Sequence, residues 1–348
     1  MSTIRTLRSA VKRLQQKHIT KAKARRFATG VNQLAFQEFT SLNAAGRKLG
    51  GNRWTGESKI RRLVTDTHLS DQLQHLLVTE AFGSCTGYWY CSLDHSQFGP
   101  FCIAVLAISV RQGRAIPIWC QVNQSEAALI APLLAALGQL LVFLATIAPD
   151  LKLILVMDRW FAADKLFTLI TAYGAYFIAR TKSDKKVQTP WDQYWQRTPI
   201  GEISPPETAV TYRQHQLRLI RSELLPGMKD PEPWFLLTNL PDTQHKGDVD
   251  GVTRRQLLNR YAERFEIEEA FKDIKWLQRL EWQRVRKPTV IRNLLLFVFL
   301  GWWLLWRYGG KQVIAANAKL HSKKRLSWFR VVWEQLQTAM TAQLCLLT

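Results

Sequence analysis

The order of the elements expected between residues 86 and 180 constrains the fold of this chain more than any other feature. Three β-prone segments come first, rich in aromatic and β-branched residues and separated by short turns: 86–98 (TGYWYCSLDHSQF), 101–110 (FCIAVLAISV) and 115–122 (AIPIWCQV). Helix and strand then alternate: an apolar helix over 125–147, a buried strand over 151–158, a helix over 159–174 and a strand over 175–180. This order predicts an α/β fold with a mixed sheet.

Three consecutive strands followed by alternating helices and strands are the order of the ribonuclease-H-like fold, in which helices flank a mixed sheet. In that order the first and fourth strands are neighbours. A β-rich insertion is expected over 181–250, where eight of the chain's thirteen prolines fall among short β-prone runs. A further helix is expected over 252–276. The sequence therefore predicts a ribonuclease-H-like core that is interrupted by a β-rich insertion.

The chain is strongly basic, with a net charge of +21 and a pI of about 10.1. Such a charge indicates a polyanionic partner, most simply nucleic acid, although an anionic membrane surface would also satisfy it. Residues 1–62 hold fifteen lysines and arginines against two glutamates, with apolar residues at helical spacing among them. We therefore predict a helical N-terminal DNA-binding domain over 1–85, although residues 1–26 taken alone fit an ordinary solvated basic helix equally well.

Two apolar segments raise the question of a membrane. Residues 294–306 are too short to span one, whereas 128–148 are long enough but are interrupted by Pro132, Gly138 and Gln139. We interpret both segments as buried helices, with a membrane span at 128–148 as the less favoured alternative. Five scattered cysteines without a CxxC pair, and an N-terminus without a signal-peptide pattern, indicate the reducing cytosol.

The helix expected over 252–276 carries an unusual arrangement of charges. At 100° per residue, four side chains share a stripe about 60° wide: Tyr261, Arg264, Glu268 and Lys275. Three other carboxylates of this helix fall on another side: Glu266, Glu269 and Asp273. Glu266 and Glu269 are expected to tolerate substitution there, as surface residues do. A surface helix with i,i+4 pairs such as Glu268 with Lys272 is the alternative. Surface pairing gives no reason for these four residue types to share one stripe.

Two aspartates lie on strands that should be neighbours. Asp94 falls in the first strand segment, and Asp158 ends the buried fourth strand, where open α/β sheets place their sites. Taken singly, Asp94 could be a turn residue and Asp158 a helix cap. Together with Glu268 they would form a cluster of three carboxylates, which cannot all ionise without cations. Two Mg²⁺ ions, which prefer oxygen ligands and leave positions for phosphate and water, would satisfy such a cluster.

The sequence also resembles bacterial insertion-sequence transposases of the DDE type, in the branch marked by a Y-x2-R-x3-E-x6-K signature. The four residues of the stripe, from Tyr261 to Lys275, match that spacing at every position. The segments LDHS around Asp94 and LVMDRWF around Asp158 match the two aspartate motifs, and this branch also carries a β-rich insertion before the glutamate. The resemblance spans about residues 27–310 and is strongest over 86–280.

The resemblance implies a function and a mechanism. Asp94, Asp158 and Glu268 would hold two Mg²⁺ (or Mn²⁺) ions, and water would attack at the end of the element to free a 3′-OH. That hydroxyl would cut the opposite strand, through a hairpin in relatives of this branch, and would later attack target DNA. The implied partners are double-stranded DNA, both as terminal inverted repeats and as target, and a second copy of the chain when two ends are paired.

The resemblance also assigns residues to DNA. Tyr261, Arg264 and Lys275 would contact phosphates near the cut, which suits a forked guanidinium and a point-charge ammonium. In relatives an aromatic residue from the insertion stacks on a flipped base. Three tryptophans of the insertion are candidates for that role, and all three could instead be core residues: Trp191, Trp195 and Trp234.

These inferences divide the chain into five parts. They are a DNA-binding domain (1–85), the first part of the catalytic core (86–180), the insertion (181–250), the second part of the core (251–310) and a basic helical tail (311–348). We expect a cytoplasmic, nucleoid-associated protein without a membrane partner. A catalytically silent, domesticated transposase acting as a DNA-binding protein is the alternative, although the three intact carboxylates argue against it.

Overall fold

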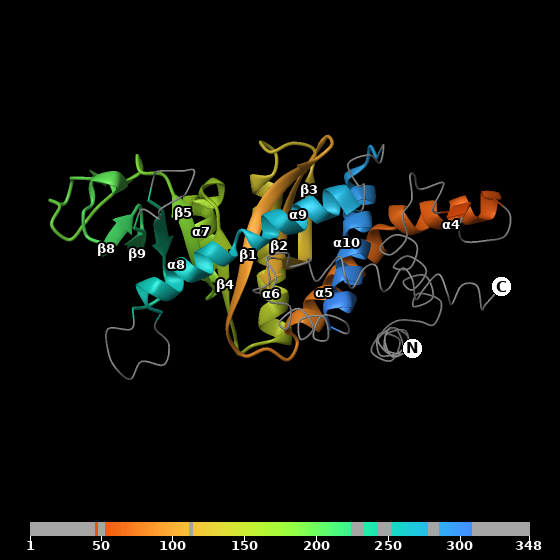
Figure 1. The fold of residues 1–348 in the computed structure, drawn as a ribbon, viewed down its shortest axis with the longest axis horizontal. Helices are drawn as coiled ribbons and strands as arrows, with labels where there is room; N and C mark the ends of the chain where they lie inside the picture. Colours follow the sequence, from red (N-terminus) through yellow and green to blue (C-terminus); the bar gives the residue numbers. More distant parts are fainter. Residues whose placement is uncertain are drawn as a thin grey trace, which may run out of the picture.

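The computed structural model describes residues 46–47, 53–110, 114–223, 233–242, 252–277 and 285–307. Most of the predicted N-terminal DNA-binding domain and the whole predicted C-terminal tail lie outside the described residues. An eight-stranded mixed sheet, mostly antiparallel, runs through the described part in the order β3-β2-β1-β4-β5-β10-β9-β8 (Figure 1). The part of this order from β3 to β5 is consistent with the predicted ribonuclease-H-like core.

The three predicted strands of the first half form an antiparallel meander: β1 (Gly87–Phe98), β2 (Phe101–Ser109) and β3 (Ala115–Asn123). The two-residue turn between β1 and β2 contains Gly99, whose φ of 56° is a conformation that favours glycine. Two parallel strands follow: β4 (Leu151–Met157), which pairs with β1, and β5 (Tyr176–Thr181), which pairs with β4. The predicted adjacency of the first and fourth strands is therefore confirmed.

The segment predicted as an insertion is rich in strands where it is described. Three of its strands continue the main sheet beyond β5: β8 (Glu207–Tyr212), β9 (His215–Arg221) and β10 (Phe235–Thr238). Two shorter ones pair only with each other in a two-stranded sheet: β6 (Lys186–Val187) and β7 (Thr198–Pro199). The β-rich segment thus extends the core sheet rather than standing apart from it.

Seven helices are described: α4 (Arg53–Thr65), α5 (Thr67–Phe82), α6 (Ile130–Ile147), α7 (Asp164–Ala172), α8 (Arg254–Glu263), α9 (Glu266–Leu277) and α10 (Pro288–Leu305). There are also two short 3-10 turns, Arg159–Phe161 and Ile200–Glu202. The predictions for α6 and α7 began too early. Residues 125–129 form a turn before α6, where the Ala128 amide donates to the Ser125 hydroxyl, and the chain after β4 makes a 3-10 turn before α7.

Strand β4 is buried on both faces, which explains its continuous apolar sequence. Ile154 and Val156 join Leu257 and Tyr261 of α8 in one apolar cluster. The alternate residues of β4 belong to the main core. Helix α8 therefore covers the face of the sheet at β4, and α9 continues across β1, β2 and β3 (Figure 1).

The two apolar helices differ in their burial. Helix α10 is buried from Asn293 to Trp303 and packs against β3, α4 and α5, which confirms its interpretation as a core helix. Helix α6 is only partly buried: Leu133, Leu137 and Leu141 face the core, whereas Val142 is half exposed. Among the described helices, α6 alone is long and apolar enough to cross a membrane, and here it packs against α5, α7 and β3.

A buried asparagine joins α10 to the two N-terminal helices. The Asn293 side chain is fully buried; it donates to the carbonyls of Val64 (2.8 Å) and Asp66 (3.0 Å) and contacts the Ser70 hydroxyl. These carbonyls lie at the junction between α4 and α5. Asn293 therefore satisfies backbone groups that would otherwise be buried without a partner.

Replacing Asn293 with alanine is expected to lower the free energy of unfolding by about 2–3 kcal/mol, because buried acceptors would lose their donor. The measurement is denaturant unfolding of the purified variant. Asn123→Ala is the matched control, since Asn123 makes its hydrogen bond to Ala128 in an exposed position. Equal losses for the two variants would contradict a special role for Asn293.

Candidate active site

The two predicted aspartates lie side by side on parallel strands. Leu93 of β1 pairs with Met157 of β4, and the residue that follows each of them along the chain is an aspartate, Asp94 and Asp158 respectively. Asp94 lies within β1, opposite Val105 of β2, and is 7% exposed, so it is not a turn residue. The parallel register therefore brings the two carboxylates to the same edge of the sheet core.

Asp158 does not act as a helix cap through its side chain. It precedes the 3-10 turn Arg159–Phe161, but its carboxylate makes no capping hydrogen bond. Instead the Tyr261 hydroxyl donates to Asp158 Oδ1 at 3.5 Å. The first residue of the signature thus contacts the second aspartate.

Arg264 joins the first aspartate to the glutamate. Its Nη1 donates to Asp94 Oδ2 at 2.6 Å and its Nη2 to Glu268 Oε1 at 2.9 Å. The guanidinium is 3% exposed and lies over the rings of Tyr261 (5.6 Å) and Phe265 (4.7 Å). Through Tyr261 and Arg264, all three predicted carboxylates belong to one connected network.

Lys275, the fourth signature residue, lies two helical turns beyond Glu268. Its Nζ is 5.1 Å from the centre of the Phe98 ring at the end of β1. The pairing of Glu268 with Lys272 that a surface helix would favour is replaced by the bond from Arg264, and Lys272 pairs with Glu269 at 2.5 Å. Two of the four signature residues, Tyr261 and Arg264, therefore contact the aspartates, Glu268 joins them through Arg264, and Lys275 lies further along α9.

Burial and neighbouring charge act in opposite directions on Asp94. Burial raises the pKa of its carboxyl above the ordinary value, while the Arg264 guanidinium and the His95 amide, which donates at 2.8 Å, lower it. Burial also raises the pKa of the Tyr261 phenol to about 12, so the hydroxyl remains a donor at neutral pH. The ionised form of Asp94 therefore depends on a cation beside it.

The prediction of one continuous helix over 252–276 is wrong, because the structure has two helices there. Thr253 and Gln256 form a capping box that begins α8, which ends at Glu263, and α9 begins at Glu266. Bonds from residue i to i+3 at Arg264 and Ile267 tighten the chain between them. The sequence signal for this break was the acidic run Glu266–Glu269, because carboxylates favour the first turn of a helix.

The prediction that Glu266 and Glu269 are surface residues on the far face of the helix is wrong for Glu266, whereas Glu269 is 40% exposed. Glu266 Oε2 accepts hydrogen bonds from the Ser109 hydroxyl (2.6 Å) and the Val110 amide (3.2 Å) at the end of β2. These contacts hold the first turn of α9 against the sheet. Helical periodicity correctly placed Glu266 on a different side of the helix from Glu268. It could not show that the end of β2 packs against that side.

Arg114 supplies the partner for the other two carboxylates. Its Nε lies 2.6 Å from Asp273 Oδ2 and its Nη1 3.6 Å from Glu269 Oε2. Arg114 stands just before β3, so α9 is fixed to both ends of the segment that joins β2 to β3. Sequence analysis missed this residue, because no local pattern relates Arg114 to a helix more than 150 residues later.

Removing Arg114 is expected to destabilise the protein by about 1–3 kcal/mol, because Asp273 would be left largely buried without its cation. Thermal unfolding of Arg114→Ala measures the loss. Arg213→Ala is the control: Arg213 is 64% exposed and 3.9 Å from Asp164, so its loss should stay within about 0.5 kcal/mol. An Arg114 variant as stable as this control would contradict the docking role.

Two aromatic side chains accompany the aspartates. His95 follows Asp94, and its ring lies 4.4 Å from the ring of Trp160, which is two residues beyond Asp158. The His95 Nε2 is 3.6 Å from Glu126 Oε1 before α6. The contact of His95 with Trp160 links β1, which carries Asp94, to the turn that follows Asp158. The sequence signal that could have identified His95 and Trp160 was their position next to the two aspartate motifs.

The three tryptophans of the insertion separate into two kinds. Trp234 is 6% exposed and packs edge-on against Tyr261 at 5.0 Å, so it belongs to the core. Trp191 and Trp195 are 58% and 77% exposed. Only the latter two present their rings to solvent in this structure.

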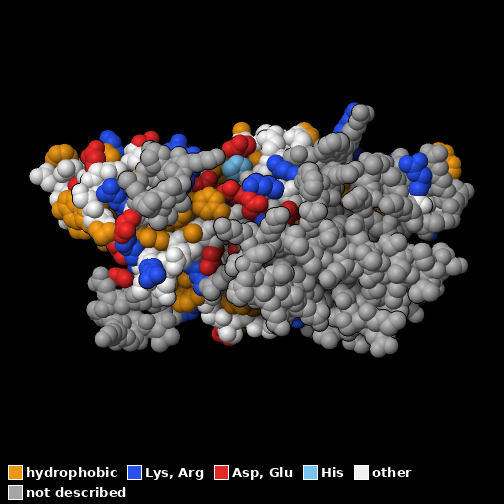
Figure 2. Space-filling view, in the orientation of Figure 1, with side chains coloured by type: hydrophobic (Ala, Val, Ile, Leu, Met, Phe, Trp, Pro, Cys, Tyr) orange, Lys and Arg blue, Asp and Glu red, His pale blue; other side chains and the backbone are white. Residues whose placement is uncertain are grey.

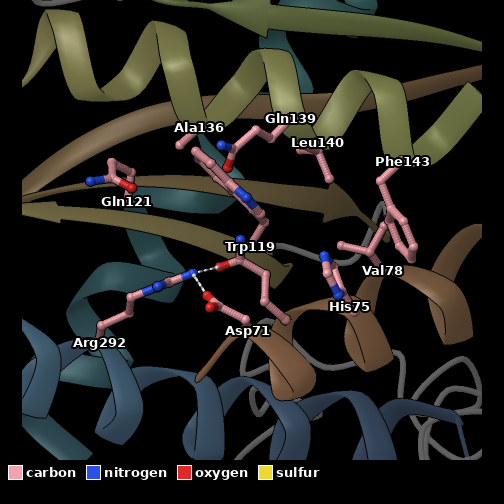
Figure 3. A pocket seen from close by; sticks show the side chains of 11 residues that line it. Asp71, His75, Val78, Trp119, Gln121, Ala136, Gln139, Leu140, Phe143 and Arg292 are labelled. Atoms are coloured by element: carbon pink, nitrogen blue, oxygen red, sulfur yellow. Dashed lines mark hydrogen bonds and ion pairs between the residues drawn. The ribbon is translucent and has the colours of Figure 1, made fainter. Parts of the chain in front are cut away.

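A cavity of about 280 Å³ lies elsewhere, between α5, α6, β3 and α10 (Figure 3). Arg292 and Asp71 form an ion pair of 3.1 Å at one side of it, and His75 stacks on Phe143 at the other. None of the predicted site residues lines this cavity. Acidic side chains instead gather around the junction of α8 and α9 (Figure 2).

The carboxylate oxygens of Asp94, Asp158 and Glu268 are the donors that Mg²⁺ and Mn²⁺ prefer, so the donor set fits these ions chemically. In the part of the chain that is described, however, no three acidic, histidine or cysteine side chains are drawn together closely enough to hold one ion. Arg264 provides the positive charge between Asp94 and Glu268.

The sequence matches the family described as "Transposase DDE domain" over residues 105–304. The chain belongs to this family. A comparison with curated proteins found no match. The matched segment of the transposase DDE domain contains Asp158 and Glu268, whereas Asp94 lies before it, so Asp94 is implicated by the strand register and by Arg264. Family membership supports a transposase, which acts on DNA.

Proposed function

We propose that this protein is a metal-dependent transposase that cuts DNA at the ends of an insertion sequence and joins the freed 3′-OH ends to target DNA. One observation carries the proposal. Asp94 and Asp158, on neighbouring parallel strands, and Glu268, on α9, are connected through Tyr261 and Arg264. Packing alone gives no reason for three carboxylates from elements far apart in the sequence to meet in one polar network around a buried arginine.

In this proposal Asp94, Asp158 and Glu268 hold two Mg²⁺ (or Mn²⁺) ions. When bound, these ions would supply activation of a water molecule and stabilisation of the leaving oxygen of a phosphodiester. The Tyr261 hydroxyl orients the Asp158 carboxylate, and the contacts of Glu266 and Arg114 fix the helix that carries Glu268. Lys275 lies on the same helix, where its ammonium would contact a DNA phosphate.

The resemblance to the Y-x2-R-x3-E-x6-K branch supports a cut-and-paste route through a DNA hairpin, performed by a dimer on paired ends. A hairpin needs a base to leave the stack, and an aromatic ring can hold it. The exposed Trp191 and Trp195 are suited to that role, and the buried Trp234 is not. The N-terminal segment 1–85 would bind the terminal repeats.

The test is cleavage of a labelled duplex that carries the DNA flanking the gene on each side. We expect nicking that leaves a 3′-OH when Mg²⁺ or Mn²⁺ is present, and none in EDTA. Cleavage that is equally fast in EDTA would contradict a metal-dependent site. Tight binding of the duplex without cleavage in either metal would instead support the alternative, a silent transposase that only binds DNA.

A further inference from the structure

Arg264 occupies an unusual position for a residue expected to contact DNA. Its guanidinium is 3% exposed, and it donates at once to Asp94 Oδ2 (2.6 Å) and Glu268 Oε1 (2.9 Å). Its buried Nε has no hydrogen-bond partner among the described residues. In this state the arginine faces two carboxylates, and its burial leaves the guanidinium closed to a DNA phosphate that approaches from solvent.

The same contacts limit the room for another cation. Both oxygens of Asp94 are engaged, Oδ2 by Arg264 and Oδ1 by the His95 amide at 2.8 Å. A divalent ion held by Asp94 and Glu268 would lie beside the guanidinium, and the like charges would repel, most strongly near Asp94, whose side chain is 10% exposed, and less near Glu268, whose side chain is 44% exposed. The guanidinium and the ions therefore compete for the same two carboxylates.

We propose that Arg264 is the internal counter-ion of the site before metal and DNA bind, and that it releases Asp94 or Glu268 when divalent cations bind. This inference rests on the proposed function, because it assumes that these carboxylates hold the ions. Arg264 offsets part of the negative charge of these two carboxylates and holds them in place in the resting protein. Once released, the guanidinium becomes available to a DNA phosphate.

The exchange couples two ligands. A phosphate that attracts the released guanidinium favours the state in which the carboxylates are open to cations, and cations favour the state in which Arg264 is open to phosphate. By linkage each ligand then tightens the binding of the other. The resting protein would hold metal weakly, and the site would assemble fully on DNA.

The experiment measures Mn²⁺ binding to the full chain without DNA, by electron paramagnetic resonance of the free ion. We expect Arg264→Ala and Arg264→Gln to bind Mn²⁺ about three- to tenfold more tightly than the wild type, because a competing charged contact is lost. Arg264→Gln keeps a polar side chain, so it provides the measurement if Arg264→Ala does not fold. Arg260→Ala is the matched control: Arg260 lies on α8, pairs with Glu263 at 2.9 Å, and should not change Mn²⁺ affinity.

The outcomes are distinguishable. Equal or weaker Mn²⁺ binding by both Arg264 variants would overturn the counter-ion role. Asp158→Asn tests the site itself: if it binds Mn²⁺ as the wild type does, the proposed metal site and the proposed function fail together. Adding end DNA should tighten Mn²⁺ binding more in the wild type than in Arg264→Gln, and an equal effect in both would contradict the coupling.

Discussion

Replacing Glu268 with glutamine is expected to slow strand cleavage by about a thousandfold or more, a loss of about 4 kcal/mol of transition-state stabilisation. The change removes one charge and almost no volume. A neutral amide is a poor ligand for Mg²⁺, and Arg264 would lose one of its two carboxylate partners. Initial cleavage rates on an end-containing duplex measure the effect, with DNA affinity and melting temperature recorded beside them.

Glu269→Gln is the matched control on the same helix. Glu269 is 40% exposed and pairs with Lys272 and Arg114, so its cleavage rate should stay within about threefold of the wild type, as for surface substitutions of about 0.5 kcal/mol. Glu266 is unsuitable as a control because it bonds Ser109 and Val110. Equal sensitivity of Glu269 and Glu268 would remove Glu268 from the proposed metal site.

Deleting residues 1–52 is expected to remove most of the affinity for end DNA and to flatten its dependence on salt. This segment holds eleven lysines and arginines against one glutamate, and each cation that contacts a phosphate releases counterions on binding. The deletion ends before α4 (Arg53–Thr65) because α4 packs against α10 and so contributes to the core. Binding isotherms at several salt concentrations measure the affinity for end DNA and its salt dependence.

The melting temperature of the truncated chain is the control for this deletion, and it should remain close to that of the full chain. A truncated protein that binds end DNA as tightly as the full chain, with the same salt dependence, would place end recognition elsewhere. The basic C-terminal segment 311–348 would then be the next candidate.

Much of the fold could be predicted because its strands carry strong local signals. β1, β2 and β3 are rich in β-branched and aromatic residues and are bounded by turns, and β4 is apolar throughout because both of its faces are buried. The order of these elements was enough to predict that β1 and β4 are neighbours. The position of Asp94 beside Asp158 follows from that adjacency.

The break between α8 and α9 was missed because helical periodicity over 252–276 was taken as one uninterrupted helix, although the acidic run at the start of α9 was a local signal for it. The other parts that were not predicted depend on contacts between distant segments. The partners of Glu266 and Asp273 come from the β2–β3 segment, which no spacing along the helix reveals. The burial of Arg264 between two carboxylates likewise depends on how α9 packs against β1.

The central claim is that Asp94, Asp158 and Glu268 hold the divalent ions that this transposase uses to cut DNA. Anomalous diffraction from crystals of the DNA-bound protein grown with Mn²⁺ tests it most directly. The account predicts Mn²⁺ peaks bound by these three carboxylates, with Arg264 withdrawn from at least one of them. A structure in which Mn²⁺ binds elsewhere, while the same preparation cleaves its DNA, would contradict it.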